Sequence, residues 1–567
     1  MSNILELYIG SKIKVLMHLT KFSPYISNRS CTIYVPRYGI IPKGLGVRDL
    51  IIRGIPFVYV CKDFIEAYAG IFRPERMFYS INKSLNGSEL NIIISDEIFH
   101  LLKLLKELKE PITLDQQALI SFLWLGRVVG RNTLIKNIKL LDGGELLKIN
   151  EDGASLEQCF SPWTPQTIAK SIEELEEEFM NVIMEVFKEY INVIKMENVL
   201  VIVPLSAGLD SRLVLSMIHV LGYRNVITLT YGLREAEYPV AKKVAEILGY
   251  ENIFIEYTWD LWRKYLRDML DYMAYASQLT TTPNIQEYVS TREFIKKCCD
   301  DVFKHTKILF VVGDISNIIS GKEPCPLELL SIRNIKELVN FIVQKHVLFE
   351  PTTHKETALL KWVLFKFFKE AMEMKHDWMS LVTLYEVFHW KDRHFRYISS
   401  SRLPYIYYGL RYITPLWDGR IIKFLSSIPW QLRYKTNLYS NTLRKNLFRP
   451  LNIDIEDPTK RDIRITTIIP DVAKKLVPKT IVNLYGRYIL SKIKNPCGFD
   501  VYFPRLFTLA FQQYERSKSD TSSNVPVDFT KTHLKLIPRD IIAFNTLTTL
   551  IMLNEKFLKD NIHTSSL

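Results

Sequence analysis

The sequence predicts an α/β protein with two large domains, an N-terminal α+β layered domain followed by a doubly wound parallel sheet with a helical C-terminal part. The chain has 567 residues, which is too many for a single hydrophobic core. Turn-forming residues cluster in EDGASLEQCFSPWTPQT, and helix-like and strand-like segments alternate after it. We therefore expect domains over residues 1–165 and 166–450, with residues 451–567 as an extension of the second domain.

The composition is that of an ordinary globular protein, with 47% hydrophobic and 24% charged residues. The longest apolar stretch is interrupted by Pro204, Asp210 and Arg212, so no membrane helix is expected. The start of the chain lacks the pattern of a secretory signal, which predicts a cytoplasmic protein. The formal charge of +13 is spread along the chain, which indicates a solvated basic surface rather than a nucleic-acid site.

The seven cysteines show neither a CxxC pair nor any other metal-ligand spacing, and their number is odd. We expect them to be reduced thiols.

The N-terminal part, up to about residue 165, contains short apolar runs separated by turns, such as IPFVYV, MFYSIN and NIIISD. This pattern is typical of strands in a layered domain. The next segment, SIEELEEEFMNVIMEVFKEYINVI, places apolar residues three and four apart and acidic residues in its first turns. It predicts a long amphipathic helix.

A strand-like VLVIV is followed by two copies of a helix-then-strand unit. LVLSMIHVLGY precedes NVITLTYG, and 27 residues later VAKKVAEILGY precedes NIFIEYTW. Both helices end at LGY, which places Gly222 and Gly249 where a left-handed C-cap residue belongs. The resulting β-α-β-α-β order predicts a parallel sheet whose ligand site lies at the carboxyl ends of its strands.

The remaining chain is expected to be helical over residues 330–450 and basic and mixed from about 455. The stretch RDIIAFNTLTTLIML predicts a packing helix rather than a membrane anchor.

The junction VLVIVPLSAGLDSRLVL carries the strongest local signal for a ligand. An apolar strand ends at Pro204, a small-residue loop spans residues 205–211, and a helix begins at about Arg212. Such a loop leaves N–H groups at a helix N-terminus, which form an anion site. Ser206 and Ser211 can donate hydrogen bonds, whereas Asp210 would repel phosphate unless Mg²⁺ lay between them. The alternative is an ordinary turn with an Asp or Ser helix cap.

The loop SAGLDS resembles the S-G-G-x-D-S loop of the asparagine synthetase family, with Ala207 in place of a glycine. This methyl is tolerated at a negative φ and costs roughly 1–2 kcal/mol at a positive one. Further segments resemble family motifs in the same order, namely NIIISDEIFHLLKLL, GRNTLIKNIKLLDGGELLKI, FSPW, REAEYPVAKKVAEILG, ILFVVGDISNIISG and ITPLWDGRIIKFLSSIPWQL. The resemblance implies an Ntn-hydrolase-like, glutaminase-type first domain and a PP-loop ATP-pyrophosphatase domain.

The resemblance also implies a set of site residues. Those expected to bind ATP are Leu205, Ser206, Gly208, Asp210, Ser211, Tyr231, Val312 and Gly313. Asp314 occupies an acidic position beside the reacting groups, and Lys460 or, alternatively, Arg461 would face pyrophosphate. Asp210 and Asn317 are the expected Mg²⁺ ligands, and we expect Asp210 to lie on a loop outside the core.

The sequence departs from the family at several places. Asn317 and Ile318 replace acidic residues, and Arg411 and Ile413 stand where the family has E-x-R. Ser2 stands in place of the N-terminal cysteine that serves the family as glutaminase nucleophile, and the glutamine-binding segments are not found. The first domain is therefore expected to be a structural remnant.

The expected function is that of an ATP-dependent amide-forming ligase. It would use ATP and Mg²⁺ to activate a small-molecule carboxylate, with aspartate as one candidate, for attack by an amine or ammonia. The alternative is a non-catalytic ATP-binding or scaffold protein. A homodimer is compatible with either function.

Overall fold

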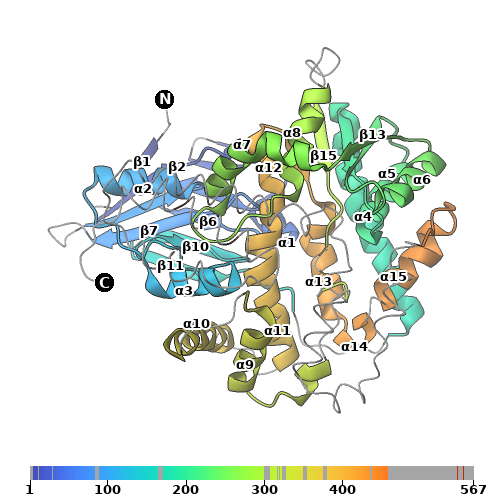
Figure 1. Cartoon of the computed structure of the whole chain (residues 1–567). Coiled ribbons are helices and arrows are strands. Elements are labelled where there is room, and N and C mark those ends of the chain that lie inside the picture. Colours follow the sequence, from blue (N-terminus) through green and yellow to red (C-terminus); the bar gives the residue numbers. More distant parts are fainter. Residues whose placement is uncertain are drawn as a thin grey trace.

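Strands form three sheets in the computed structural model of the chain (Figure 1). The structure describes residues 4–456, except for 11, 29, 84–88, 164–169, 299–306, 316, 318, 322–326, 349–353, 374–379 and 435–436, together with 546, 549 and 553. The predicted domain boundary near Pro165 lies outside the described residues.

The first sheet is mixed and has five strands. Its order is β1 (Ile4–Ile9), β2 (Ile13–His18), β8 (Leu90–Ser95), β7 (Phe78–Lys83) and β9 (Lys139–Leu140). Only β2 and β8 pair in parallel. Consecutive residues Ile92, Ile93 and Ile94 are all buried, so both faces of this sheet are covered.

The second sheet is antiparallel and has six strands. Its order is β11 (Gly153–Gln158), β10 (Glu145–Asn150), β6 (Ile65–Tyr68), β5 (Phe57–Cys61), β4 (Cys31–Pro36) and β3 (Phe22–Ser27). One face shares a core with the first sheet, through residues such as Val58 and Ala67. The other face, with Phe57 and Tyr68, belongs to a second core.

The third sheet has five parallel strands, as the sequence predicts for the second half of the chain. Its order is β14 (Glu251–Glu256), β13 (Val226–Gly232), β12 (Leu200–Pro204), β15 (Ile308–Val311) and β16 (Arg411–Ile413). The chain leaves β12 toward β13 on one side and returns on the other side as β15, so the connections change direction at β12. The sequence patterns did not predict β16, whose three residues are too few to show a period.

Helices cover the sheets and fill the region between them. They are α1 (Val47–Arg53), α2 (Ile98–Glu107), α3 (Gln116–Leu125), α4 (Ile172–Glu197), α5 (Leu209–Val220), α6 (Tyr238–Leu248), α7 (Trp259–Ser277), α8 (Gln286–Cys298), α9 (Ile335–His346), α10 (His354–Glu373), α11 (Leu381–Phe388), α12 (Leu403–Tyr407), α13 (Gly419–Ser427), α14 (Trp430–Arg433) and α15 (Asn437–Leu443). Shorter or wider helical turns are η1 (Leu327–Ser331), η2 (His389–Ile398), η3 (Ser399–Arg402), η4 (Pro415–Trp417) and η6 (Arg444–Phe448).

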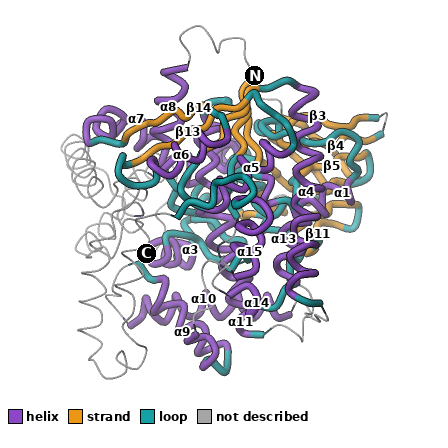
Figure 2. Tube along the Cα trace, turned by 90° about the vertical axis from the view of Figure 1, so that its right-hand side faces the viewer, coloured by secondary structure: helices purple, strands orange, loops and turns teal. Residues whose placement is uncertain are grey.

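Helices pack on both faces of the parallel sheet. Alternate residues of β12 belong to different cores: Ile202 packs in the core that contains α7 and α8, and Val201 in the core that contains α4, α5 and α6. Figure 2 shows α4 beside α5, α13 and α15, and these helices are in contact. The predicted two-sided winding of this sheet is therefore observed.

Local predictions for the helices are largely confirmed. Ser171 caps α4 in a capping box with Glu174, and Gly222 and Gly249 have the left-handed φ expected after α5 and α6. Thr546, Thr549 and Leu553 are helical and buried, with a hydroxyl of Thr546 bonded to Thr282. The other residues of this predicted packing helix lie outside the described residues.

Two expectations are corrected. α5 begins at Leu209 rather than near Arg212, because Gly208 is already extended at the N-cap and the acidic Asp210 suits the first turn. Cys31 and Cys61 form a disulfide rather than remaining reduced. Antiparallel pairing of β4 with β5 places these cysteines directly opposite each other, a proximity that spacing along the chain does not reveal.

The two halves of the molecule are joined by buried polar contacts from the helices between them. The sheets of the first half lie on one side in Figure 1 and the parallel sheet on the other, with α11, η2 and α13 in the middle. From η2, Trp390 donates a hydrogen bond to the backbone of Ile71, and Arg396 pairs with Asp142. The first half thereby forms a fixed wall against the second.

Candidate functional site

A cavity of about 330 Å³ opens at the carboxyl ends of β12, β13 and β15. It lies where the strand order changes direction, which is where open parallel sheets bind ligands. Seven of the residues predicted for the site line it: Leu205, Ser206, Ser211, Tyr231, Val312, Gly313 and Asp314. Gly208, Asp210 and Asn317 are not among its lining residues.

The loop after β12 is held in shape by its two serines. The hydroxyl of Ser211 accepts a hydrogen bond from the backbone N–H of Ser206 at 3.0 Å and lies 3.0 Å from the Ser206 hydroxyl. The Ser206 hydroxyl in turn accepts a hydrogen bond from the N–H of Gly208. Gly208 is the N-cap of α5 and has no side chain to cap the helix. The first turn of α5 therefore presents its N–H groups beside the cavity, in the arrangement that binds anions.

Ala207 does not distort this loop. Its φ is not positive, so the added methyl carries no left-handed strain, and its side chain is buried in the core beneath the loop. Alanine is therefore tolerated at position 207, the outcome expected for a negative φ.

Gly313 allows the segment after β15 to approach the start of α5. A Cβ added at this position would lie 2.5 Å from the Cα of Ser211 and 2.6 Å from the carbonyl oxygen of Asp210. These neighbours are backbone atoms and cannot turn aside. The close contact of the two segments therefore requires glycine here.

Asp210 lies in the first turn of α5 and is buried, which corrects the expectation of a loop residue outside the core. Its Oδ1 accepts a hydrogen bond of 2.7 Å from the hydroxyl of Tyr439, and its Oδ2 one of 3.4 Å from the N–H of Ile315. The helix start at Leu209 turns this carboxylate toward α15 and the segment after β15. Asp210 thus ties the start of α5 to α15 and to the segment after β15.

The wall opposite the phosphate loop was not predicted. It comes from the start of α8 and the residues just before it, from the end of η2, and from η3 and α12. The lining residues are Asn284, Gln286, Glu287, Ile398, Ser401, Arg402 and Tyr405. These residues form no short motif, and η3 is more than a hundred residues from α8 along the chain. Only the tertiary structure brings them together.

Arg402 links this wall to the predicted site. Its Nη2 donates a hydrogen bond of 2.9 Å to Oδ2 of Asp314, and its Nη1 lies 3.5 Å from Oε1 of Glu287. Burial acts to lower the pKa of the Arg402 guanidinium, but the carboxylates of Asp314 and Glu287 raise it overall. Arg402 therefore stays charged between two acids.

Glu287 has an unusual titration for a carboxyl group. Burial raises its pKa to about 7, although Arg402 and a hydrogen bond from Tyr231 act in the opposite direction. Near neutral pH both of its protonation states are populated.

The described residues fit the phosphates of a nucleotide better than they fit a protein-bound magnesium ion. The helix terminus, the two hydroxyls and the small loop residues form an anion site. Both oxygens of Asp210, however, accept hydrogen bonds within the protein. Among the described residues, no group of three or more His, Cys, Asp or Glu is placed to hold a metal ion.

Other predicted residues lie elsewhere. Arg411, on β16, forms an ion pair with Glu197 of α4. Ser2, Ile318, Lys460 and Arg461 lie outside the described residues.

A second polar cluster lies between the two halves, around a cavity of about 50 Å³. Its acids are matched by cations: Asp142 pairs with Arg396 at 3.1 Å and with Lys391 at 3.7 Å, and Glu145 pairs with Arg131 at 2.7 Å. Burial acts to raise the pKa of Asp142, but Arg396, Lys391 and Arg131 outweigh it and hold this pKa below its usual value. The cluster thus fastens the two halves together.

The sequence matches no protein-family model and no curated protein. Within the described part of the chain, no helix combines the length and apolarity that crossing a bilayer requires.

Proposed function

We propose that the protein is an ATP-dependent amide-forming ligase that resembles asparagine synthetase. The observation that carries this proposal is the convergence of SAGLDS and VVGD, more than a hundred residues apart, on one cavity at the switch point of a parallel sheet. Two motifs that matched the family by chance would not be expected to line the same cavity of small-molecule size.

The triphosphate of ATP would bind at the start of α5. Backbone N–H groups and the hydroxyls of Ser206 and Ser211 supply donors, and the ring of Tyr231 at the end of β13 offers an apolar surface for the base. Magnesium would arrive bound to the phosphates, which agrees with the habit of Mg²⁺ to take few protein ligands.

In the proposed reaction a carboxylate oxygen attacks the α-phosphorus of ATP and pyrophosphate leaves. The nitrogen of an amine or ammonia then attacks the acyl carbon of the adenylate, forming the amide and releasing AMP. The protein accelerates both steps mainly by position and by electrostatic stabilisation of the leaving groups. Lys460 or Arg461 remains our proposed partner of pyrophosphate.

We further propose that residues 1–165 form a degenerate glutaminase-like domain. Two sheets that share a core, with helices against their outer faces, agree with the layering of an Ntn-hydrolase-like fold. With Ser2 in place of the cysteine nucleophile, this domain would contribute structure rather than ammonia.

A non-catalytic nucleotide-binding protein is the second candidate. Two contacts favour it, because both acids of the predicted site already have partners within the protein. Arg402 is bound to Asp314, and Tyr439 donates a hydrogen bond to Asp210. In this case ATP would bind without turnover.

Exchange of labelled pyrophosphate into ATP separates the two candidates, because adenylation is reversible and needs no amine. We expect exchange only in the presence of a particular carboxylate, tested with aspartate, other amino acids and a metabolite extract. Ser211→Ala, which removes a hydroxyl from the cavity, should reduce exchange about tenfold or more. Ser216→Ala, which removes a buried hydroxyl from the same helix outside the cavity, is the matched control. Binding of ATP without exchange in any mixture would instead establish the second candidate.

A further inference from the structure

Glu287 is a buried carboxyl group in the wall that faces the phosphate loop. It lies in the first turn of α8, is 8% exposed and lines the 330 Å³ cavity. Its Oε2 is buried and has no hydrogen-bond partner among the described residues. A buried acceptor without a partner costs about 1–3 kcal/mol, so its presence beside a cavity points to a ligand that donates a hydrogen bond.

Arg402 fixes the direction of this carboxyl group. It approaches Oε1 of Glu287 with Nη1 while its Nη2 is bound to Asp314, so the guanidinium separates the two acids. Arg402 therefore engages Oε1, and Glu287 lines the cavity from the start of α8. Asp314, in the segment that approaches the phosphate loop, is held by the other terminal nitrogen of the guanidinium.

A purely structural role explains less of this arrangement. An acid in the first turn of a helix is stabilised by the helix dipole, but that effect requires neither burial nor a cavity. Glu293, on the same helix, shows the ordinary case: it is bound by Lys264 and Tyr265 of α7, and these contacts hold its pKa below the usual value against the effect of burial.

We propose that Glu287 receives the amine nucleophile of the reaction, its Oε2 accepting a hydrogen bond from the nitrogen and taking a proton as the nitrogen attacks. The inference rests on the proposed function. In this step the C–N bond forms, the bond between the acyl carbon and the phosphate oxygen breaks, AMP leaves with that electron pair, and one proton passes to Glu287.

The charge of the cavity agrees with a basic ligand. Its lining contains the acids Glu237, Glu287 and Asp314 and the cation Arg402. Ammonia and a primary amine share the chemistry that this wall would recognise, and the experiment below separates these two sources.

The titration of Glu287 supports a role in proton transfer. A base whose pKa lies near the working pH accepts a proton readily and still exists in its ionised form. Its pKa of about 7 arises from burial and from Asp314, opposed by Arg402 and Tyr231. Tyr272 of α7 and Tyr405 of α12 also feel its charge. The rate of amide formation should therefore rise with pH through about 7 in the wild type.

The test compares two half-reactions in Glu287→Gln, using the carboxylate that supports exchange in the wild type. Pyrophosphate exchange should stay near the wild-type rate, because it needs no amine. Release of AMP driven by ammonium chloride or by methylamine should fall about 100-fold or more, and its rise with pH should reduce to the rise in free amine alone. Hydroxylamine is largely uncharged at neutral pH and needs less help from a base, so hydroxamate formation should fall far less. A preference of the wild type for methylamine over ammonium chloride would identify an organic amine as the substrate class.

Glu293→Gln removes a carboxylate from the same helix away from the cavity and should leave both half-reactions unchanged. Absence of exchange in the wild type overturns the proposed function and this inference with it. If the wild type exchanges but Glu287→Gln retains amine-driven AMP release, only the inference fails. Loss of exchange in Glu287→Gln, together with its loss in Glu287→Asp, would place Glu287 in adenylation or folding instead and would also overturn it.

Discussion

Two buried acids, Asp142 between the halves of the molecule and Glu287 in the cavity, respond to burial in opposite ways. Asp142 faces three cations and its pKa is held below the usual value, whereas Glu287 faces one cation shared with Asp314 and its pKa rises to about 7. Burial is similar at the two positions. The balance of nearby charge therefore decides which acid fastens the structure and which remains available for chemistry.

The two cavities around these acids differ in the same sense. The space beside Asp142 is about 50 Å³ and is surrounded by matched ion pairs, while the space beside Glu287 is about 330 Å³ and borders a loop suited to anions. A cluster of charges by itself does not mark a site. A candidate site is indicated instead where buried acids outnumber the cations beside them and border a cavity of sizeable volume.

Removing the acid of the matched cluster should have the largest effect on stability. Asp142→Ala leaves Arg396 and Lys391 buried with one acid fewer, so the free energy of unfolding should fall by about 3–5 kcal/mol in denaturant titration. Because the pKa of Asp142 is lowered in the folded state, its contribution is present above its unfolded pKa and is lost as pH falls through the folded value. The loss caused by the mutation should therefore shrink in acid.

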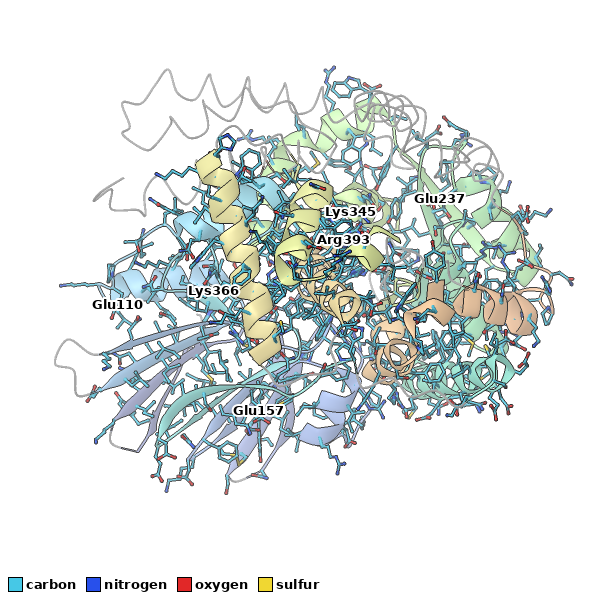
Figure 3. The ribbon with its side chains drawn as sticks, turned by 90° about the horizontal axis from the view of Figure 1, so that it is seen from below. Glu110, Glu157, Glu237, Lys345, Lys366 and Arg393 are labelled. Carbon is cyan, nitrogen blue, oxygen red and sulfur yellow. A yellow bond between two sulfur atoms is a disulfide. The ribbon has the colours of Figure 1, made fainter. Side chains whose placement is uncertain are left out.

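Glu157→Ala provides the control for this measurement. Glu157, labelled in Figure 3, lies on the second sheet and pairs with Lys148. Both side chains are exposed, so the pair should contribute no more than about 1 kcal/mol. If Glu157→Ala and Asp142→Ala lowered the free energy of unfolding equally, the buried ion pairs of Asp142 would be no more stabilising than a surface pair.

Gly313→Ala should separate binding from stability at the open cavity. The added carbon collides with the backbone of Asp210 and Ser211, so we expect a loss of about 1–3 kcal/mol and a weakening of ATP affinity by at least tenfold in calorimetry. Gly39→Ala is the control, since its new carbon would have no neighbour nearer than 3.6 Å. Unchanged ATP affinity in a folded Gly313→Ala would show that the two segments do not form the nucleotide site.

Asp210→Ala should have a smaller effect on stability but a clear one on binding. It removes an acceptor from Tyr439, which predicts a loss of about 1–2 kcal/mol on unfolding. Tyr439→Phe breaks the same hydrogen bond and keeps the carboxylate. A greater loss of ATP affinity in Asp210→Ala than in Tyr439→Phe would assign Asp210 a role at the nucleotide, whereas equal losses would assign it to positioning alone.

Ser2→Ala should have no effect at all. We expect the protein to release no glutamate from glutamine at enzyme-like rates, because Ser2 without glutamine-binding partners cannot complete acyl transfer. Glutamate release that disappears in Ser2→Ala would contradict the contrast between a structural first half and a ligand-binding second half.

The local order of the second half could be read from the sequence. Helix and strand periods repeat in the two units whose helices end at Gly222 and Gly249, and each unit is fixed by contacts between residues close along the chain. The phosphate loop was identifiable for the same reason, since a strand, a small-residue loop and a helix are adjacent in sequence.

The tertiary structure alone decided the rest of the site. Glu287 and Arg402 meet because α8 and η3 fold against the same end of the sheet. Asp210 is buried rather than on a loop, because α5 begins at Leu209 and because the hydroxyl of Tyr439 donates a hydrogen bond to its carboxylate. Cys31 and Cys61 are joined by strand pairing in the same way. Local patterns follow from backbone period and turn chemistry, whereas the pairing of buried charges depends on distances between segments that only the packed core sets.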